Sequence, residues 1–211
     1  MYRAIVRLAD SLVSFLAENR LLPQALMARR QRKRIRFLRS LGISGGTGAE
    51  IGVQKGFFSH TLLRELSPQR LHLIDPWYLL GDKWEWASGN KSTNKAVRNV
   101  LYWFRRELSA PAPRVALHIG FDEDVLQQFP DHYFDWVYLD TSHEYEPTKV
   151  ELSLLSKKVK PEGIILGDDW FSDPSHLFYG QYRAVTEFVR DFGYSIVYAS
   201  DTDHQWAIRK T

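Results

Sequence analysis

The feature that most constrains the fold is a short apolar run ending in two glycines four residues apart, within Ala49-Glu50-Ile51-Gly52-Val53-Gln54-Lys55-Gly56. The helix-like segment 57–66 follows, so the pattern predicts a strand, a tight turn and a helix N-terminus. Gly52 can take backbone angles closed to other residues, Gly56 permits close approach, and a helix N-terminus offers free N–H groups. A carboxylate beside the turn, Glu50, suits a ligand's ammonium or hydroxyl groups better than a pyrophosphate. We therefore expect a ligand at this turn.

Length and composition favour one α/β domain. The 211 residues, 44% of them hydrophobic, can bury one sizeable core, and strand and helix signals alternate along the chain. We expect this domain over residues 46–211 and a basic helical extension over residues 1–45. The absence of cysteine excludes disulfides and thiolate metal sites. Because neither a long apolar stretch nor a signal-peptide pattern occurs, we expect no transmembrane segment and a cytoplasmic protein.

The positive charge belongs to the N-terminal extension. Residues 1–40 contain ten Lys or Arg and two acidic residues, a balance of +8, whereas the whole chain carries +3. Apolar residues recur there at helical spacing up to Pro23, and a basic run follows over residues 29–39. We interpret this as a helix that covers the sheet domain or a partner subunit, with solvated arginines, and a homo-oligomer through this helix stays open. Contact with an anionic membrane surface or nucleic acid is the alternative, but no RNA-binding signature accompanies the charges, and we expect no nucleic-acid partner.

The second and third strands end on residues suited to a nucleoside. The segment 71–75 reads as a strand that ends on Asp75, 23 residues after Gly52. An acidic residue there can receive two ribose hydroxyls, although a helix N-cap or a loop position is the alternative. A tryptophan-rich segment and a helix over about residues 93–108 come next, and they wall a pocket or pack on the core. The third strand, 115–119, leads to Phe121-Asp122, where an adenine can be held.

Two further strands end on acidic residues. The strand 134–140 ends on Asp140, and the strand at 163–167 is followed by Asp168 and Asp169. If these strands are parallel neighbours, the three carboxylates converge at one edge of the sheet. Because uncompensated carboxylates repel, we expect a hard divalent ion such as Mg²⁺ between them. The alternative is a helix N-cap at Asp169 and a loop position for Asp140.

His143 follows Asp140 by three residues. Beside a metal-bound hydroxyl, a neutral imidazole can accept the proton. A structural histidine is the alternative.

Four segments together resemble class I S-adenosylmethionine-dependent methyltransferases, and their order and spacing carry the resemblance. The segments are Glu50-Ile51-Gly52-Val53 through Gly56, Ile74-Asp75-Pro76-Trp77, Asp135 to Asp140 with His143 and Tyr145, and Pro161 to Asp169. The branch that the chain resembles most is that of metal-dependent macrolide sugar O-methyltransferases, and catechol O-methyltransferase is more distantly similar. The resemblance covers about residues 46–209. It implies a Rossmann-like α/β fold with a seven-stranded, mostly parallel sheet, helices on both faces, and last strands at 194–198 and 205–208.

The resemblance also implies a cofactor site. By resemblance, Glu50 and the turn from Gly52 to Gly56 receive the methionine part of S-adenosylmethionine. Asp75 receives the ribose hydroxyls, and the loop at Phe121-Asp122 receives the adenine.

The acceptor side follows from the same resemblance. Asp140, Asp168 and Asp169 match magnesium ligands, and His143 matches a general base. The implied reaction is O-methylation of a hydroxylated small molecule, a sugar or a glycosylated metabolite. Two departures affect the acceptor: the bulky pair Trp170-Phe171 follows the last ligand, and the basic extension lies outside the resemblance.

Two other classes of function remain open from sequence. A nucleotide-dependent oxidoreductase on a Rossmann sheet is supported by the glycine turn and Asp75, but Glu50 and the lack of a full G-x-G-x-x-G weaken it. A non-catalytic module of the same fold is the other, since fold does not guarantee activity.

Overall fold

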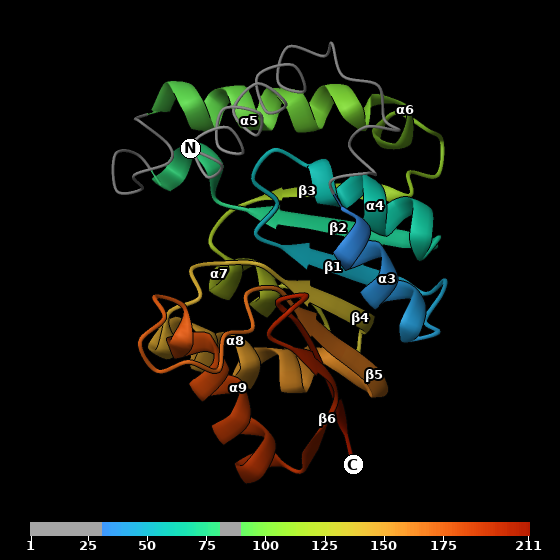
Figure 1. The fold of residues 1–211 in the computed structure, drawn as a ribbon. Coiled ribbons are helices and arrows are strands. Elements are labelled where there is room, and N and C mark those ends of the chain that lie inside the picture. The colour runs from blue at the N-terminus through green and yellow to red at the C-terminus, as the bar shows by residue number, and fades with distance from the viewer. Residues whose placement is uncertain (1–30, 81–89) are drawn as a thin grey trace.

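The computed structural model describes residues 31–80 and 90–211, and within them seven strands form a single sheet (Figure 1). The strand order is β3-β2-β1-β4-β5-β7-β6, with every pair from β3 to β5 parallel and β7 antiparallel to both of its neighbours. The strands are β1 (Thr47–Ile51), β2 (Arg70–Asp75), β3 (Val115–Ile119), β4 (Phe134–Leu139), β5 (Val159–Gly167), β6 (Tyr194–Ser200) and β7 (Gln205–Lys210). This confirms the predicted Rossmann-like α/β fold with a seven-stranded, mostly parallel sheet.

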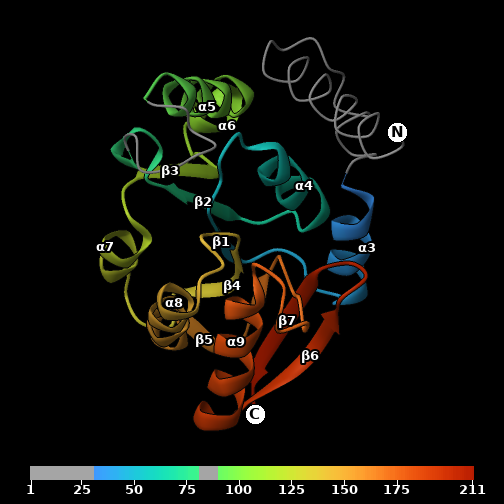
Figure 2. The same ribbon diagram turned by 60° about the vertical axis from the view of Figure 1, so that its left-hand side comes forward.

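Helices cover both faces of the sheet, as Figure 2 shows. One face carries α3 (Arg32–Ser40), α4 (Phe57–Glu65), α5 (Asn90–Trp103) and α6 (Arg105–Leu108); the other carries α7 (Asp122–Gln127), α8 (Tyr145–Lys158) and α9 (Tyr179–Phe192). Alternate side chains of β4 enter two separate cores, since Trp136 and Tyr138 pack on the α3–α5 side and Val137 and Leu139 on the α8–α9 side. Among the described residues, no helix has the length and apolar character needed to cross a bilayer.

One helix was predicted over about residues 93–108, but the structure has two helices there, α5 and α6. The prediction of a single continuous helix was therefore wrong. Between α5 and α6, Phe104 leaves helical geometry at φ −100° and ψ 12°. Its ring is fully buried and stacks on His60 of α4, at 4.4 Å between centroids. The Phe104 ring packs into the core at the point where the two helices meet.

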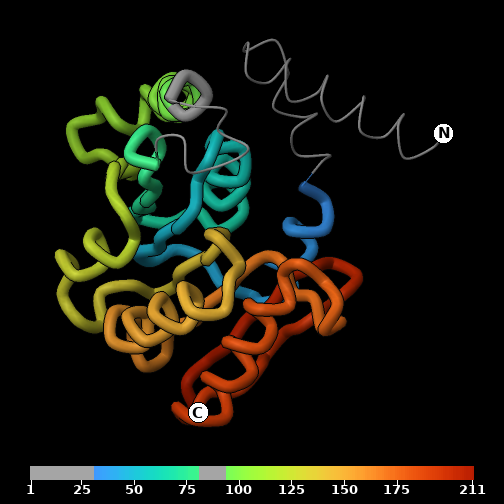
Figure 3. The backbone as a smooth tube through the Cα atoms, turned by 90° about the vertical axis from the view of Figure 1, so that its left-hand side faces the viewer, coloured from blue at the N-terminus to red at the C-terminus, as the bar shows by residue number. Residues whose placement is uncertain are grey.

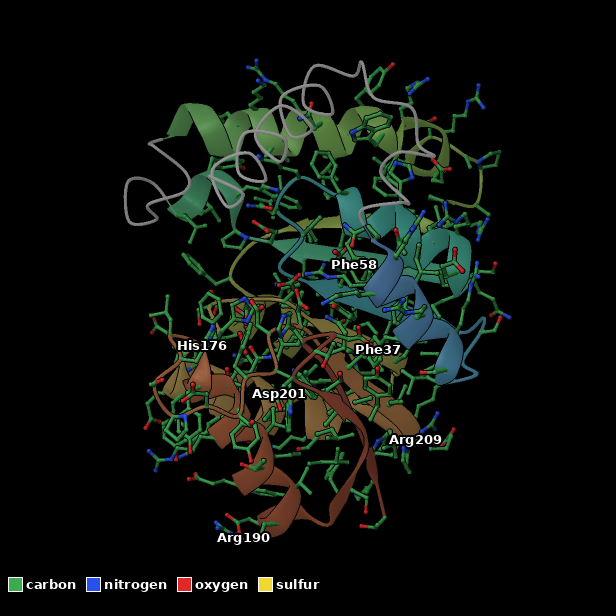
Figure 4. All side chains as sticks on the ribbon, in the orientation of Figure 1. Phe37, Phe58, His176, Arg190, Asp201 and Arg209 are labelled. Atoms are coloured by element: carbon green, nitrogen blue, oxygen red, sulfur yellow. The ribbon has the colours of Figure 1, made fainter. Side chains whose placement is uncertain are left out.

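The helix α3 packs into the core of the sheet domain. Phe37 and Leu38 are 0% and 1% exposed, and Figure 4 shows Phe37 on the same side of the sheet as Phe58. Figure 3 shows α3 in blue beside the red turn that joins β6 to β7, where the Lys33 ammonium donates to the Thr202 carbonyl. The amphipathic segment expected before Pro23 lies outside the described residues, and the domain boundary at residue 45 stays a prediction.

Trp77 belongs to the core. It lies in a short 3-10 helix, η1 (Trp77–Leu80), is fully buried, and donates its indole N–H to the Gln54 carbonyl at 2.7 Å. Of the two roles considered for the tryptophan-rich segment, core packing is therefore the role of this residue. The other tryptophans before α5, Trp84 and Trp86, lie outside the described residues.

Candidate active site at the carboxyl edge of the sheet

The glycine turn joins the ends of three strands. Gly52 has φ +85° and donates its N–H to the Ile74 carbonyl of β2 at 3.0 Å. A Cβ at this position would overlap the carbonyl oxygen of Asp140, directly after β4, so only glycine lets β1 and β4 end so close together. Gly56, at φ +73°, is the N-cap of α4, and a Cβ there would lie 2.9 Å from Val100 of α5. The turn therefore brings the predicted cofactor and acidic sites into direct contact.

Glu50 lies under this turn and is 1% exposed. The hydroxyl of Ser59, on the first turns of α4, donates to its carboxylate. Burial raises the pKa of Glu50 well above its usual value of 4.5, and the Ser59 hydrogen bond offsets only part of this effect. A cationic ligand group placed nearby would favour the ionised form of Glu50.

Asp75 holds the turn from inside. One carboxylate oxygen accepts the N–H groups of Val53 and Gln54 at 2.9 and 2.8 Å, and the other accepts that of Trp77 at 2.7 Å. Burial raises the pKa of Asp75, while these three hydrogen bonds oppose the shift. The structure thus gives Asp75 a role in shaping the turn, and its contact with a ribose stays a prediction.

Phe121 and Asp122 lie beside the end of β2. The Gly120 N–H donates to the Asp75 carbonyl at 3.2 Å, Phe121 is 45% exposed, and Asp122 begins α7. One buried oxygen of Asp122 has no hydrogen-bond partner among the described residues. Glu151 of α8, which sequence reasoning missed, is 3% exposed, and burial together with the Asp122 charge raises its pKa. This edge therefore offers a ligand the exposed Phe121 ring, while the unpaired Asp122 oxygen is buried.

The acidic cluster contains a cation from α3. A guanidinium nitrogen of Arg34 lies 3.0 Å from Asp140 Oδ2 and also pairs with Asp168 Oδ2. The same group lies 4.6 Å from the centroid of the Phe58 ring. Burial by itself lowers the pKa of Arg34, but the neighbouring Tyr138 and Asp140 outweigh it and the pKa is raised. The prediction that the arginines of the basic run are solvated was therefore wrong for Arg34, because the helix turns this residue toward the sheet.

His143 presents one defined nitrogen to the cluster. Gln181 of α9 donates its amide N–H to the Asp168 carbonyl at 2.6 Å, so its amide oxygen is the group that lies 2.6 Å from His143 Nδ1. The proton of a neutral His143 is therefore on Nδ1, and Nε2 carries the lone pair. Nε2 lies 3.0 Å from Asp169 Oδ2 and 3.6 Å from Asp140 Oδ1. His143 Nε2 therefore faces two carboxylates of the cluster.

Two residues of the cluster have left-handed backbone conformations. His143 has φ +60° and Asp169 has φ +56°, which is costly for residues other than glycine. Asp140, His143 and Asp169 each offer one ligand atom, and these atoms all lie within 4.8 Å of one another. The carboxylate and imidazole set fits a small divalent cation in its spacing and donor chemistry.

The bulky pair after Asp169 has two different environments. Trp170 is 5% exposed and packs on Tyr182 of α9, with 4.7 Å between centroids. Phe171 stacks between His176 and His204 at 3.6 and 4.4 Å. Only Phe171 therefore belongs to an aromatic group beside the cluster.

Comparisons with known proteins agree with this fold. A family model described as a methyltransferase domain matches residues 49–170, more than half of the chain. The chain belongs to this methyltransferase family. No curated protein matches it significantly.

Solved structures share the fold at low identity. A Corynebacterium glutamicum protein matches with TM-score 0.62 and 14% identity, over 96% of each chain. The Podospora anserina methyltransferase PaMTH1, solved with S-adenosylhomocysteine, gives 0.61 and 14% over 96% of this chain and 95% of its own. A putative caffeoyl-CoA O-methyltransferase from Staphylococcus aureus gives 0.61 and 14% over 96% and 91%.

Proposed function

We propose that this chain is an S-adenosylmethionine-dependent O-methyltransferase that acts on a hydroxylated small molecule, with His143 as the general base. The observation that carries the proposal is the position of His143 Nε2. The lone-pair nitrogen faces Asp140, whose backbone is packed against Gly52 of the glycine turn. The glycine turn, to which we assign the methyl donor, and the proposed base thus lie at the same edge of the sheet.

The donor is assigned to the turn by its chemistry. Glu50 and the free N–H groups at the start of α4 suit the amino acid part of the donor, and Asp75 and the Phe121-Asp122 loop suit its nucleoside. The Podospora neighbour with bound S-adenosylhomocysteine shares the fold, which supports this choice of cofactor. A nicotinamide cofactor has no comparable support.

Methyl transfer is an in-line displacement at the methyl carbon. S-adenosylmethionine supplies that carbon on a sulfonium, and the acceptor oxygen forms the new C–O bond as the S–C bond breaks. His143 Nε2 takes the hydroxyl proton, while Gln181 keeps the opposite ring nitrogen protonated. The S-adenosylhomocysteine leaving group carries away the electron pair of the broken bond.

The acidic cluster is the proposed metal site. Asp140, Asp168 and Asp169 meet at the ends of β4 and β5, with the Asp168 N–H bonded to the Leu139 carbonyl at 3.1 Å. A divalent ion such as Mg²⁺, when bound, would lower the pKa of the acceptor hydroxyl and fix its direction. A sugar or glycosylated acceptor is the class that the sequence resemblance supports, and the Staphylococcus neighbour, a putative caffeoyl-CoA O-methyltransferase, is compatible with a hydroxyl acceptor.

Two titrations and one pair of variants test the proposal. Calorimetric titration should give saturable binding of S-adenosylhomocysteine and none of NAD⁺. With radiolabelled donor and a panel of hydroxylated acceptors, His143→Asn should lower turnover by roughly 10²–10⁴-fold and leave S-adenosylhomocysteine affinity within about threefold.

The matched control is His132→Asn. His132 precedes β4 at the opposite edge and also has positive φ, +57°, a conformation that asparagine tolerates at both sites. Its turnover should equal that of the wild type. Binding of NAD⁺ alone would overturn the methyltransferase assignment, and a His143→Asn variant with wild-type turnover would remove the base.

A further inference from the structure

Arg34 is fixed in the acidic cluster by the packing of its helix. Phe37, three residues later on α3, is fully buried and contacts the Tyr198 ring at 4.9 Å between centroids. Leu38 is 1% exposed, and Arg36 pairs with Asp203 at 3.3 Å on the outside of the same helix. Withdrawal of the Arg34 guanidinium by a shift of α3 would therefore expose two core side chains. Arg34 therefore enters the cluster from a helix that is anchored in the core.

The Asp168 carboxylate has a protein partner on each oxygen. Oδ2 pairs with Arg34, and Oδ1 accepts the amide N–H of Gln205, itself 1% exposed. Gln205 is held in turn by the Tyr138 hydroxyl at 2.7 Å. The backbone carbonyl of Asp168 accepts the Trp206 indole N–H at 3.0 Å. Asp168 is thus turned toward Arg34 and β7.

The remaining ligand atoms face the other way. Asp140 uses Oδ2 for Arg34 and turns Oδ1 toward His143, and Asp169 Oδ2 lies 3.0 Å from His143 Nε2. The group of atoms within 4.8 Å of one another contains Asp140, His143 and Asp169 and leaves out Asp168. One guanidinium against three carboxylates leaves two negative charges, which one divalent ion neutralises.

We propose that Arg34 is the resident cation of Asp168 and divides the cluster into a guanidinium-bound half and an open half, in which the Asp140 and Asp169 carboxylates bind a single divalent ion and His143 Nε2 stays free to act as the base. The ligand set that the sequence resemblance implies, Asp140-Asp168-Asp169, does not fit this arrangement. The inference rests on the proposed function for the presence of a metal, and it changes which residues hold the ion. Asp168 then positions Arg34 and Gln205 instead of touching the metal.

Mn²⁺ binding tests this division. Free Mn²⁺ is measured by electron paramagnetic resonance with full-length protein saturated with S-adenosylhomocysteine. Asp169→Asn should weaken Mn²⁺ binding more than tenfold, and Asp168→Asn should leave it within about threefold. Arg34→Met should bind Mn²⁺ at least fivefold more tightly, because it frees Asp168, and the further change Asp168→Asn should remove that gain.

Arg36→Met is the matched control on the same helix. Its exposed guanidinium pairs outside the cluster, so its Mn²⁺ affinity should equal that of the wild type. Equal losses in Asp168→Asn and Asp169→Asn, or unchanged affinity in Arg34→Met, would overturn the division. Wild-type protein that binds S-adenosylhomocysteine but no Mn²⁺ would also overturn it and would leave the cofactor assignment standing. Wild-type protein that binds neither Mn²⁺ nor S-adenosylhomocysteine would overturn both the division of the cluster and the cofactor assignment.

Discussion

Asp75 shapes the glycine turn and is also the residue that we expect to bind a ribose. Its two oxygens accept three backbone N–H groups, from Val53, Gln54 and Trp77, within a site that is 5% exposed. Each carboxylate oxygen has two acceptor positions, so these three bonds leave one position, on the oxygen that accepts the Trp77 N–H, for a donor from a ribose. The turn depends on this group, and we expect a bound ribose to depend on it as well.

Asp75→Ala should consequently weaken both stability and binding. Loss of the shared acceptor leaves buried N–H groups unpaired, at a cost of roughly 2–4 kcal/mol in the free energy of unfolding. S-adenosylhomocysteine affinity should fall by about 1–3 kcal/mol from lost charge-assisted hydrogen bonds. Urea unfolding of the apo protein and calorimetry at low temperature measure the two effects. Full stability in Asp75→Ala would show that other groups shape the turn.

Sequence spacing predicted which acidic residues follow the strands and lie at the site. It did not predict the side chains that bind those acidic residues. The order of strands alone places Asp140 and Asp168 at one edge. Arg34 and Gln205 precede and follow them by long stretches of chain, and no spacing rule connects these positions. Arg34 is one of several arginines in a basic run, so its burial follows only from the orientation of α3.

The element with the least obvious sequence signal is α3. Its nine residues contain five basic side chains, yet Phe37 and Leu38 enter the core while Arg36 stays 68% exposed at its side chain. Two adjacent apolar residues are enough to orient so short a helix. The element's contribution to stability therefore lies in its apolar pair.

Phe37→Ala should lower the free energy of unfolding by about 3–4 kcal/mol, since a fully buried aromatic ring leaves a cavity. Arg36→Ala removes an exposed ion pair and should change it by less than about 1 kcal/mol. Urea denaturation of the two variants gives the comparison. Similar values for both would mean that α3 is not packed on the domain in solution.

The sequence predicted the types of the helices and strands better than it predicted their boundaries. Strand β5 begins at Val159, four residues before the start that the apolar run predicts. This start could not be predicted because the next residues, Lys160, Pro161 and Glu162, are polar or proline, and such a segment is not typical of a strand. The pairing of Val159 with Phe134, followed by a register shift, extends the strand nonetheless.

The pH dependence of the whole domain should include a pair of histidines on β2 and β3, of which His72 is buried and His118 is half-buried. His72 Nδ1 lies 2.9 Å from His118 Nε2, and aromatic rings from Phe129, Tyr133 and Phe134 surround His72. Burial, with a smaller contribution from His118, lowers the pKa of His72 from 6.5 to about 4. The folded state thus keeps a neutral ring where the unfolded chain takes up a proton.

Stability should therefore fall as pH decreases from about 6.5 toward 4 and be unaffected by this group above pH 7. Between pH 7 and pH 5 the loss from His72 is on the order of 2 kcal/mol. His72→Gln should flatten the profile of unfolding free energy against pH, measured by urea titration at each pH. His132→Gln is the control, and an equal flattening in both variants would exclude the assignment.

The close approach of β1 and β4 at Gly52 has a consequence for how such a site can change. Because a side chain at Gly52 would overlap the backbone of Asp140, neither strand end can shift without the other. Arg34, Gln181 and Gln205 all lie outside the stretch 49–170 that matches the family, so the side chains that partner Asp168 and His143 reach this junction from both ends of the sequence.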